Sequence, residues 1–133
     1  LIPLSEELAF IKAYYFLLKT RFDERLLLDI YVGNEIAQQM IPPLTLQILL
    51  ENAVKHNIIS QETPLHIVIS EVNSNKVVIS NTLQRRAQSV VSTQTGLANL
   101  AAKYQLMQQP GPEIFETQDK FSVQITLLPN QAS

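Results

Sequence analysis

The sequence predicts an α+β fold: a two-layer α/β sandwich in which helices pack on one face of a mixed, largely antiparallel sheet. Two observations predict it. Apolar residues recur at helical spacing in three segments and alternate with polar residues, as in strands, in others. The segments follow one another as helix, strand, helix, two strands, helix and two strands. Helices that interrupt short strands in this way form one layer over a sheet.

The first predicted helix covers residues 5–20. Ser5 is a helix-capping residue, the two glutamates after it suit the positive end of the helix dipole, and apolar residues then recur every three or four positions. Residues 26–32, LLLDIYV, form an apolar run that ends at a Gly-Asn pair. This combination predicts a strand followed by a turn.

The second predicted helix covers residues 41–57, IPPLTLQILLENAVKHN. Its two prolines suit a first helical turn, where a missing N–H costs little. At about 100° per residue, the apolar side chains share one face and the polar ones share the other. One face is therefore expected to be buried and the other to present polar groups to solvent. The polar residues are Gln47, Glu51, Asn52, Lys55 and His56.

The remainder of the chain predicts strands, one loop and a third helix. The strands are residues 65–72, 76–80, 113–116 and 121–128, the first two joined as a hairpin by Asn-Ser-Asn. Residues 81–95 lack a sustained period and predict a mobile loop of a length that indicates function or disorder. Gly96 then begins the third helix, which a Pro-Gly-Pro sequence ends.

Composition limits the possible functions. A chain of 133 residues suits one domain, and a net charge of −2 argues against a general nucleic-acid binder. The absence of cysteine excludes disulfides and thiol catalysis and is compatible with a cytosolic setting. No apolar run approaches the roughly 20 residues that span a bilayer. The chain begins with Leu, so it is expected to be a piece of a longer protein.

The ENAVKH core of residues 41–57 resembles the N box of the gyrase/histidine-kinase/MutL ATPases. More narrowly, IPPLTLQILLENAVKH resembles the catalytic domain of LytS-like sensor histidine kinases, and SEELAFIKAYYFLLKTRF and TGLANLAAKYQLM continue the resemblance. It implies the histidine-kinase-type ATPase fold. It also implies an ATP-binding catalytic domain in residues 23–133, with residues 1–22 leading out of a dimerisation region.

The resemblance implies roles for residues of the N box. The asparagine that matches Asn52 holds Mg²⁺ against the triphosphate in this family, and an amide oxygen is a ligand that Mg²⁺ accepts. Lys55 and His56 would meet phosphate oxygens; the alternative is a solvated face with a Glu51–Lys55 pair. Glu51 would position a group near the phosphates, although the family's polar position one turn before the asparagine is Ile48 here.

The adenine site and the second glycine box depart from the family pattern. The family's Asp-Asn-Gly element is matched by Asn81-Thr82-Leu83, and the Asn81 carbonyl can still accept a hydrogen bond from the adenine amino group. The glycine box Gly-x-Gly-Leu-x-Asn is matched by residues 94–99, QTGLAN, which keep only the second glycine. The expected phosphate contacts there are Thr95, Gly96 and Leu97.

The resemblance therefore implies a two-component sensor histidine kinase that uses ATP and Mg²⁺. The γ-phosphate would pass to a histidine upstream of this chain, so the chain alone would not phosphorylate itself. The implied partners are the upstream dimerisation and phosphoacceptor region and a response regulator, with no nucleic acid and no direct membrane contact. The implied setting is the cytoplasmic domain of a membrane-anchored bacterial protein.

Two alternatives remain open on the sequence alone. The first is a degenerate domain that keeps the fold as a signalling or interaction module and does not bind nucleotide. The departures at Asn81, Leu83 and Gln94 favour it, and the intact ENAVKH box opposes it. The second is an unrelated α+β binding domain, which would leave the paired boxes unexplained.

Overall fold

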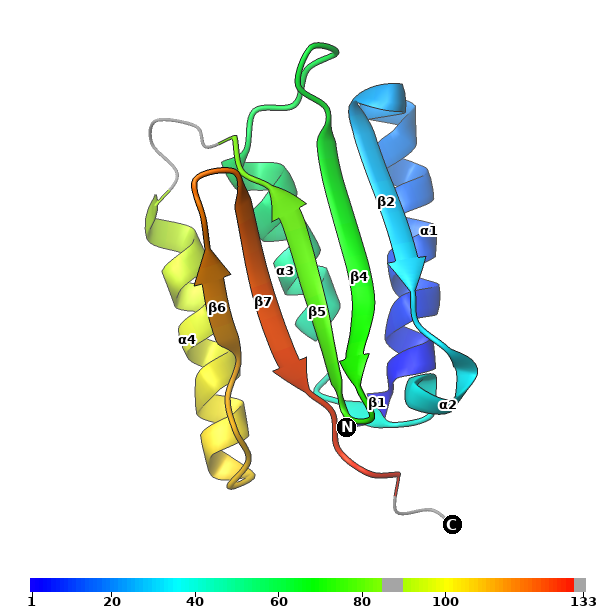
Figure 1. The fold of residues 1–133 in the computed structure, drawn as a ribbon, viewed down its shortest axis with the longest axis vertical. Coiled ribbons are helices and arrows are strands. Elements are labelled where there is room, and N and C mark those ends of the chain that lie inside the picture. Colours follow the sequence, from blue (N-terminus) through cyan, green and yellow to red (C-terminus); the bar gives the residue numbers. More distant parts are fainter. Residues whose placement is uncertain (85–89, 131–133) are drawn as a thin grey trace.

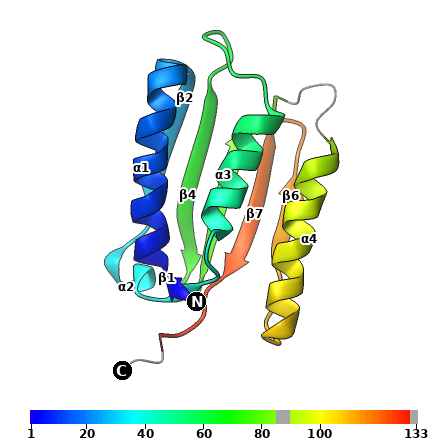
Figure 2. The same ribbon diagram turned by 180° about the vertical axis from the view of Figure 1, so that it is seen from behind.

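The computed structural model confirms the α+β sandwich (Figures 1 and 2). It describes residues 1–84 and 90–130, and of residues 90–95 only the backbone. The five-stranded sheet has the order β2-β4-β5-β7-β6, in which β2 and β4 are parallel and the other neighbours are antiparallel. The strands are β2 (Leu26–Tyr31), β4 (Leu65–Asn73), β5 (Lys76–Thr82), β6 (Glu113–Glu116) and β7 (Lys120–Thr126).

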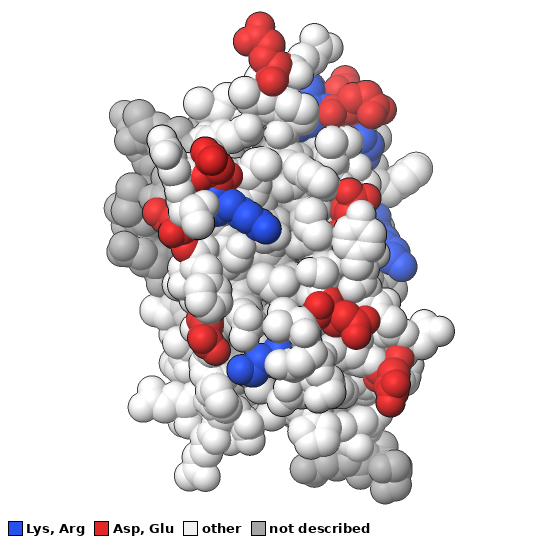
Figure 3. Space-filling model, in the orientation of Figure 1, with Lys and Arg blue, Asp and Glu red and all other residues white. Residues whose placement is uncertain are grey.

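Three long helices cover one face of this sheet. Figure 2 shows them side by side, with α3 between α1 and α4. They are α1 (Leu4–Phe22), α3 (Thr45–His56) and α4 (Val90–Leu106). The opposite face of the sheet carries no helix among the described residues (Figure 1). On that face the acidic and basic side chains are scattered and form no patch of a single charge (Figure 3).

The core lies between the helices and the sheet. In each strand every second side chain points toward the helices. In β4 these include Ile67 and Ile69, which are both fully buried. The helices contribute their apolar stripes, including Leu46 and Leu50 of α3 and Leu100 of α4. This burial holds α3 against the centre of the sheet and fixes which of its faces stays accessible.

The start of α1 differs from the prediction. The helix begins at Leu4 after Pro3, without a side-chain cap, so the predicted cap at Ser5 is wrong. The chain instead enters the helix from β1 (Ile2–Pro3), which pairs with β3 (Met40–Ile41). The Leu4 N–H donates to the Gln39 carbonyl at 2.8 Å. A backbone hydrogen bond therefore replaces a side-chain cap at this end of the helix.

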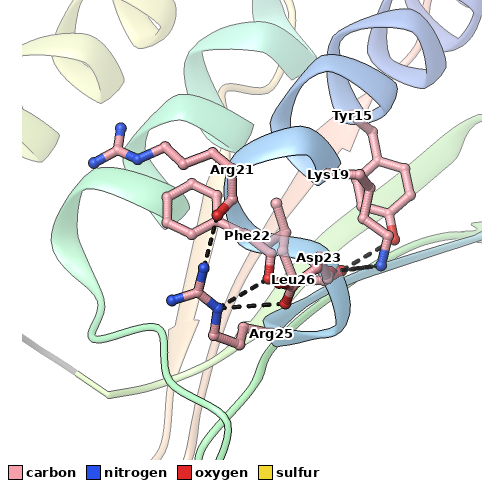
Figure 4. A network of polar contacts seen from close by, with 7 residues as sticks. All are labelled: Tyr15, Lys19, Arg21, Phe22, Asp23, Arg25 and Leu26. Carbon is pink, nitrogen blue, oxygen red and sulfur yellow. Dashed lines mark hydrogen bonds and ion pairs between the residues drawn. The ribbon is translucent and has the colours of Figure 1, made fainter.

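The end of α1 is closed by cations that meet carbonyl oxygens (Figure 4). Lys19 Nζ donates to the Asp23 and Leu26 carbonyls at 2.7 and 3.1 Å. Arg25 donates to the Arg21 carbonyl at 2.7 Å, and a short 3₁₀ turn (Asp23–Arg25) leads into β2. Positive side chains are favourable at this end of a helix, where carbonyls lack helical partners.

The helix α3 is shorter than predicted. It begins at Thr45, so the expectation that both prolines lie in its first turn is wrong. The segment before it is held by other bonds, since β3 pairs with β1 and Met40 exchanges hydrogen bonds with Leu128. The chain then turns into α3 at Leu44, which has a φ of 69°. The short helix α2 (Asn34–Ala37) was not predicted.

The helix α4 begins earlier than predicted. Residues 90–95 are helical, so the expectation that residues 81–95 form a loop and that the helix starts at Gly96 is wrong for this part. Residues 85–89 of the predicted loop lie outside the described residues. The sequence VVSTQT contains no helix breaker, so extending the helix toward its N-terminus costs little and needs no apolar period. None of the helices in the described part of the chain is long and apolar enough to cross a membrane.

Candidate functional site

The two sequence boxes meet where α4 packs on α3. An added Cβ atom at Gly96 would lie 3.1 Å from Ile48 Cγ2 and 3.4 Å from Asn52 Nδ2. Such distances leave no room for a side chain unless the neighbouring groups shift. Glycine therefore suits this close approach, and the residue that the second box retains is the one that touches the N box.

Asn52 has a side-chain donor that the described residues leave unsatisfied. Its side chain is partly exposed, and its Nδ2 is buried without a hydrogen-bond partner among the residues that the structure describes. A buried polar group without a hydrogen-bond partner lowers the free energy of unfolding by about 1–3 kcal/mol. The rigid centre of α3 thus carries an amide whose hydrogen-bonding capacity the described part of the protein does not satisfy.

Glu51 faces the other side of α3. It accepts a hydrogen bond from Gln47 Nε2 at 2.9 Å, and between these described residues no ion pair joins it to Lys55. The alternative of a Glu51–Lys55 pair is therefore wrong. Burial, and secondly the Glu51 carboxylate, raise the pKa of Tyr14 on α1 above its ordinary value. Glu51 thus lies toward α1, whereas Asn52 contacts α4.

Lys55 is exposed as expected, but His56 is not. His56 is 8% exposed, so its predicted place on the solvent face is wrong. It follows the buried Ala53 by three residues, which places the two side chains about 60° apart around the helix. The polar face of α3 is therefore narrower than the sequence indicated, and only part of the N box reaches solvent.

Asn57 joins the end of α3 to the end of β5. Its Nδ2 donates to the Ala53 carbonyl at 2.8 Å, and its Oδ1 accepts from the Gln84 N–H at 2.7 Å. Gln84 Nε2 in turn donates to the Ile58 and Thr63 carbonyls. The Asn57–Gln84 contact joins residues that lie 27 positions apart in the chain, so sequence spacing does not indicate it.

Asn81 and Thr82 belong to β5 rather than to a loop. Asn81 is 8% exposed, and its Nδ2 donates to the Thr82 carbonyl at 2.7 Å. This bond leaves the Asn81 Oδ1 as the side-chain acceptor. Thr82 Oγ1 accepts from the His66 N–H at 3.2 Å. The structure therefore holds the amide of Asn81 in one orientation at the end of β5.

The roles predicted for Gly96 and Leu97 need correction. Both lie inside α4, since the helix starts at Val90, and the amides free of helical partners belong to its first turn. Leu97 is 8% exposed and belongs to the hydrophobic core, so its side chain anchors the helix. Thr95 lies in the part of α4 whose side chains the structure does not describe.

Glu7 is a buried carboxylate whose sequence position predicts only a favourable interaction with the dipole of its own helix. It is 3% exposed, and its two oxygens accept from the Leu46 N–H at 2.9 Å and the Leu44 N–H at 3.2 Å. These amides lie at the N-terminus of α3. A sequence signal existed, because Glu7 lies in helical register with the apolar Leu4, Leu8 and Ile11.

The comparisons with known proteins agree with this architecture. No protein-family model matches the chain. The sensor protein LytS of Streptococcus mutans is 32% identical over 121 residues, which cover 80% of this chain and 21% of that protein. The sensor histidine kinase BtsS of Escherichia coli is 40% identical over 55 residues, covering 41% of this chain and 10% of that protein.

The solved catalytic domain of the histidine kinase ThkA has the same fold, with a TM-score of 0.55 and 14% identity over 97% of each chain. The chain is related to the LytS-like sensor histidine kinases and has the fold of a histidine-kinase catalytic domain. The LytS of Bacillus subtilis is also similar, at 41% identity over 56 residues, which cover 42% of this chain and 9% of that protein. The chain thus spans about a tenth to a fifth of the length of its curated relatives.

Proposed function

We propose that this LytS-like chain is the ATP-binding catalytic domain of a two-component sensor histidine kinase. Its sequence relatives and its fold support this proposal. The observation that carries it is the close packing of Gly96 on Asn52, because it unites the two boxes in which family members bind nucleotide. The reaction would be transfer of the γ-phosphate of ATP to a histidine outside these residues.

The residues present fit Mg²⁺. Asn52 carries an amide on α3, and its side chain is partly exposed. Mg²⁺ takes hard oxygen ligands and usually shares one or two protein oxygens with water and phosphates. Asn52 would hold the ion through its amide oxygen. A bound Mg²⁺ would supply neutralisation of phosphate charge.

The phosphates would lie over the accessible face of α3, beside its contact with α4. Lys55 is exposed on α3 and would supply a cation to phosphate oxygens, whereas Glu51 would act on the α1 side as a positioning group. Gly96 would shape the wall beside Asn52, and Thr95 would lie next to it on α4. His56 is buried and would support this wall from behind rather than contact phosphate.

Asn81 would recognise the base. Its Nδ2 is engaged by the Thr82 carbonyl, so its Oδ1 would accept a hydrogen bond from the adenine amino group. A neutral amide makes a weaker bond than the carboxylate that family members carry, because charge-assisted hydrogen bonds are roughly twice as strong. We therefore expect adenine recognition to persist with lower affinity.

On its own, the chain would bind ATP without phosphorylating itself. His56 is buried, and His66 lies in β4 with its Nε2 2.7 Å from Asp29 Oδ2. His66 alternates with the buried Leu65 and Ile67, so it lies on the face of the sheet opposite the helices. The phosphoacceptor would come from an upstream dimerisation region, into which residues 1–22 would lead. A response regulator would then take the phosphoryl group.

The same proposal places the chain in the cytoplasm, as part of a membrane-anchored bacterial protein, without its own contact to the membrane.

Isothermal titration of the chain with ATP, with and without Mg²⁺, tests the binding step. We expect Mg²⁺-dependent binding that Asn52→Ala weakens by about tenfold or more, which is ~1.4 kcal/mol. Gln105→Ala, an exposed amide on α4, is the matched control and should bind as the parent does. No binding at millimolar Mg·ATP would instead support a degenerate signalling module.

A further inference from the structure

The N-terminus of α3 is capped by a residue of another helix. The helix has no side-chain cap of its own, since its N-cap residue is Leu44. Glu7 of α1 supplies the missing acceptors, with one oxygen 2.9 Å from the Leu46 nitrogen and the other 3.2 Å from the Leu44 nitrogen. A carboxylate at this end of a helix is favourable for its hydrogen bonds and for the helix dipole.

The backbone of Leu44 is strained to make this contact. Its φ of 69° lies in the left-handed region, which is unfavourable for a residue other than glycine. The Leu44 side chain is exposed, so its own packing does not explain the conformation. The turn instead presents two backbone N–H groups to a single buried carboxylate. Backbone strain of this kind tends to occur at functional sites.

The position of Glu7 is itself fixed. Pairing of Ile2 with Ile41 and of Pro3 with Met40 joins the segments that lead into α1 and α3. The first turn of α1 cannot therefore shift without moving the entrance to α3. Asn52 lies six residues beyond Leu46, about 9 Å along the helix. A tilt at the capped end is thus carried to the amide.

We propose that Glu7 is a positioning residue of the nucleotide site, which holds α3 so that Asn52 faces Gly96. The inference rests on the proposed function for its consequence on ATP binding. The close packing of Gly96 on Asn52 supports it. Asn52 Nδ2 would lie only 3.4 Å from a Cβ at Gly96, so a small displacement of α3 changes this contact. It follows that the seating of α1 and nucleotide affinity are linked, so that each changes the other.

Glu7→Gln tests the proposal with little change in volume. The variant keeps one acceptor and turns a donating NH₂ toward a backbone N–H, so one of the two cap bonds is lost. Glu6→Gln is the matched control, because Glu6 is the neighbouring glutamate and is exposed. The first readout is the NMR spectrum of the Asn52 side-chain NH₂ and of the α3 amides. The second is Mg·ATP affinity at a temperature where each protein is fully folded.

We expect Glu7→Gln to shift the Asn52 signals, to speed amide exchange at Leu44 and Leu46, and to weaken Mg·ATP binding by about threefold or more. Glu6→Gln should leave all three unchanged. The proposal is overturned if Glu7→Gln lowers only the unfolding midpoint, with the Asn52 signals and the affinity as in the parent. If the parent does not bind Mg·ATP, the proposed function fails, and the Asn52 signals alone decide the role of Glu7. If Glu7→Gln does not fold, Glu7→Asp, which draws the carboxylate back by one methylene, is measured in the same way.

Discussion

Gly96 of α4 lies against Asn52 of α3, so closely that an added Cβ atom at Gly96 would be 3.4 Å from Asn52 Nδ2 and 3.1 Å from Ile48 Cγ2. The two helices are separated in the chain by the strands β4 and β5. Their contact brings together the parts of the sequence that resemble the N box and the second glycine box. The glycine of the second box lies at the position where α4 approaches Asn52 and Ile48 closely.

Gly96→Ala tests this packing directly. The added methyl group should displace α4 or Asn52 by a few tenths of an ångström and weaken Mg·ATP binding by about threefold or more. Stability should change by less than about 1 kcal/mol, because alanine also favours the helix by a similar amount. Gly111→Ala is the control, since nothing lies within 4 Å of a Cβ there. Titration calorimetry that shows equal affinities for both variants would contradict the assigned role of Gly96.

Lys55→Ala should weaken Mg·ATP binding through the loss of a cation near the phosphates. We expect a loss of about threefold to tenfold at low salt, and a smaller loss at high salt because ions screen exposed charges. Lys103→Ala removes another exposed helical lysine, on α4, and serves as the matched control. Affinities measured at several salt concentrations decide the point. A parallel loss in both variants would show that only the net charge of the chain matters.

Asp23→Gly should stabilise the protein. Asp23 has φ 47° and ψ −127°, a conformation that glycine adopts readily and other residues rarely do. The substitution relieves about 1–3 kcal/mol of backbone strain, whereas the greater flexibility of glycine in the unfolded chain costs up to about 1 kcal/mol. The free energy of unfolding should therefore rise by about 1 kcal/mol. Asp23→Ala keeps the strain and loses the exposed contact with Arg25, so it should give no gain. Urea unfolding of both variants provides the comparison; a gain in the alanine variant would argue against backbone strain.

Tyr104→Phe should change how stability depends on alkaline pH. The buried Tyr104 hydroxyl donates to the Thr126 carbonyl at 2.6 Å, and burial raises the pKa of the phenol well above its ordinary value. Its contribution is therefore present below pH ~10 and is lost as pH rises toward the folded-state pKa, because the unfolded chain releases the proton first.

We expect Tyr104→Phe to cost about 1 kcal/mol at pH 8, because the Thr126 carbonyl loses its partner. Above pH ~10 the parent should lose roughly 1.4 kcal/mol per pH unit from this group, and the variant should not. The two stabilities should thus converge in denaturant unfolding between pH 8 and pH 11. A constant difference over that range would contradict the raised pKa.

Much of the fold could be predicted because its long segments carry clear periods. The sequence predicted all five strands of the main sheet within a few residues, and β6 with its observed bounds. It could not predict β1 and β3, which have two residues each, or α2, whose four residues make only one helical turn and so show no helical period. The start of α4 at Val90 was not predicted, because the first turns of this helix contain mostly polar and small residues.

The exposure of candidate side chains on α3 could be predicted in part from sequence spacing, whereas contacts between residues far apart in the chain could not. Asn52 and Lys55 could be placed on one face of α3 from spacing alone. The burial of His56 was not predicted, and the cap that Glu7 forms depends on the approach of α1 to α3. The pairing of β1 with β3, which brings these two helices together, leaves no signal in a single sequence.

The most direct test of the nucleotide site is thermal unfolding of the chain with and without Mg·ATP, repeated on Asn52→Ala. A ligand at about 100 times its dissociation constant stabilises the native state by about 2.7 kcal/mol, a rise of several degrees in Tm for a domain of this size. We predict this rise for the parent and its loss in Asn52→Ala. An unchanged Tm of the parent at millimolar Mg·ATP would contradict the assignment of a nucleotide site to this chain.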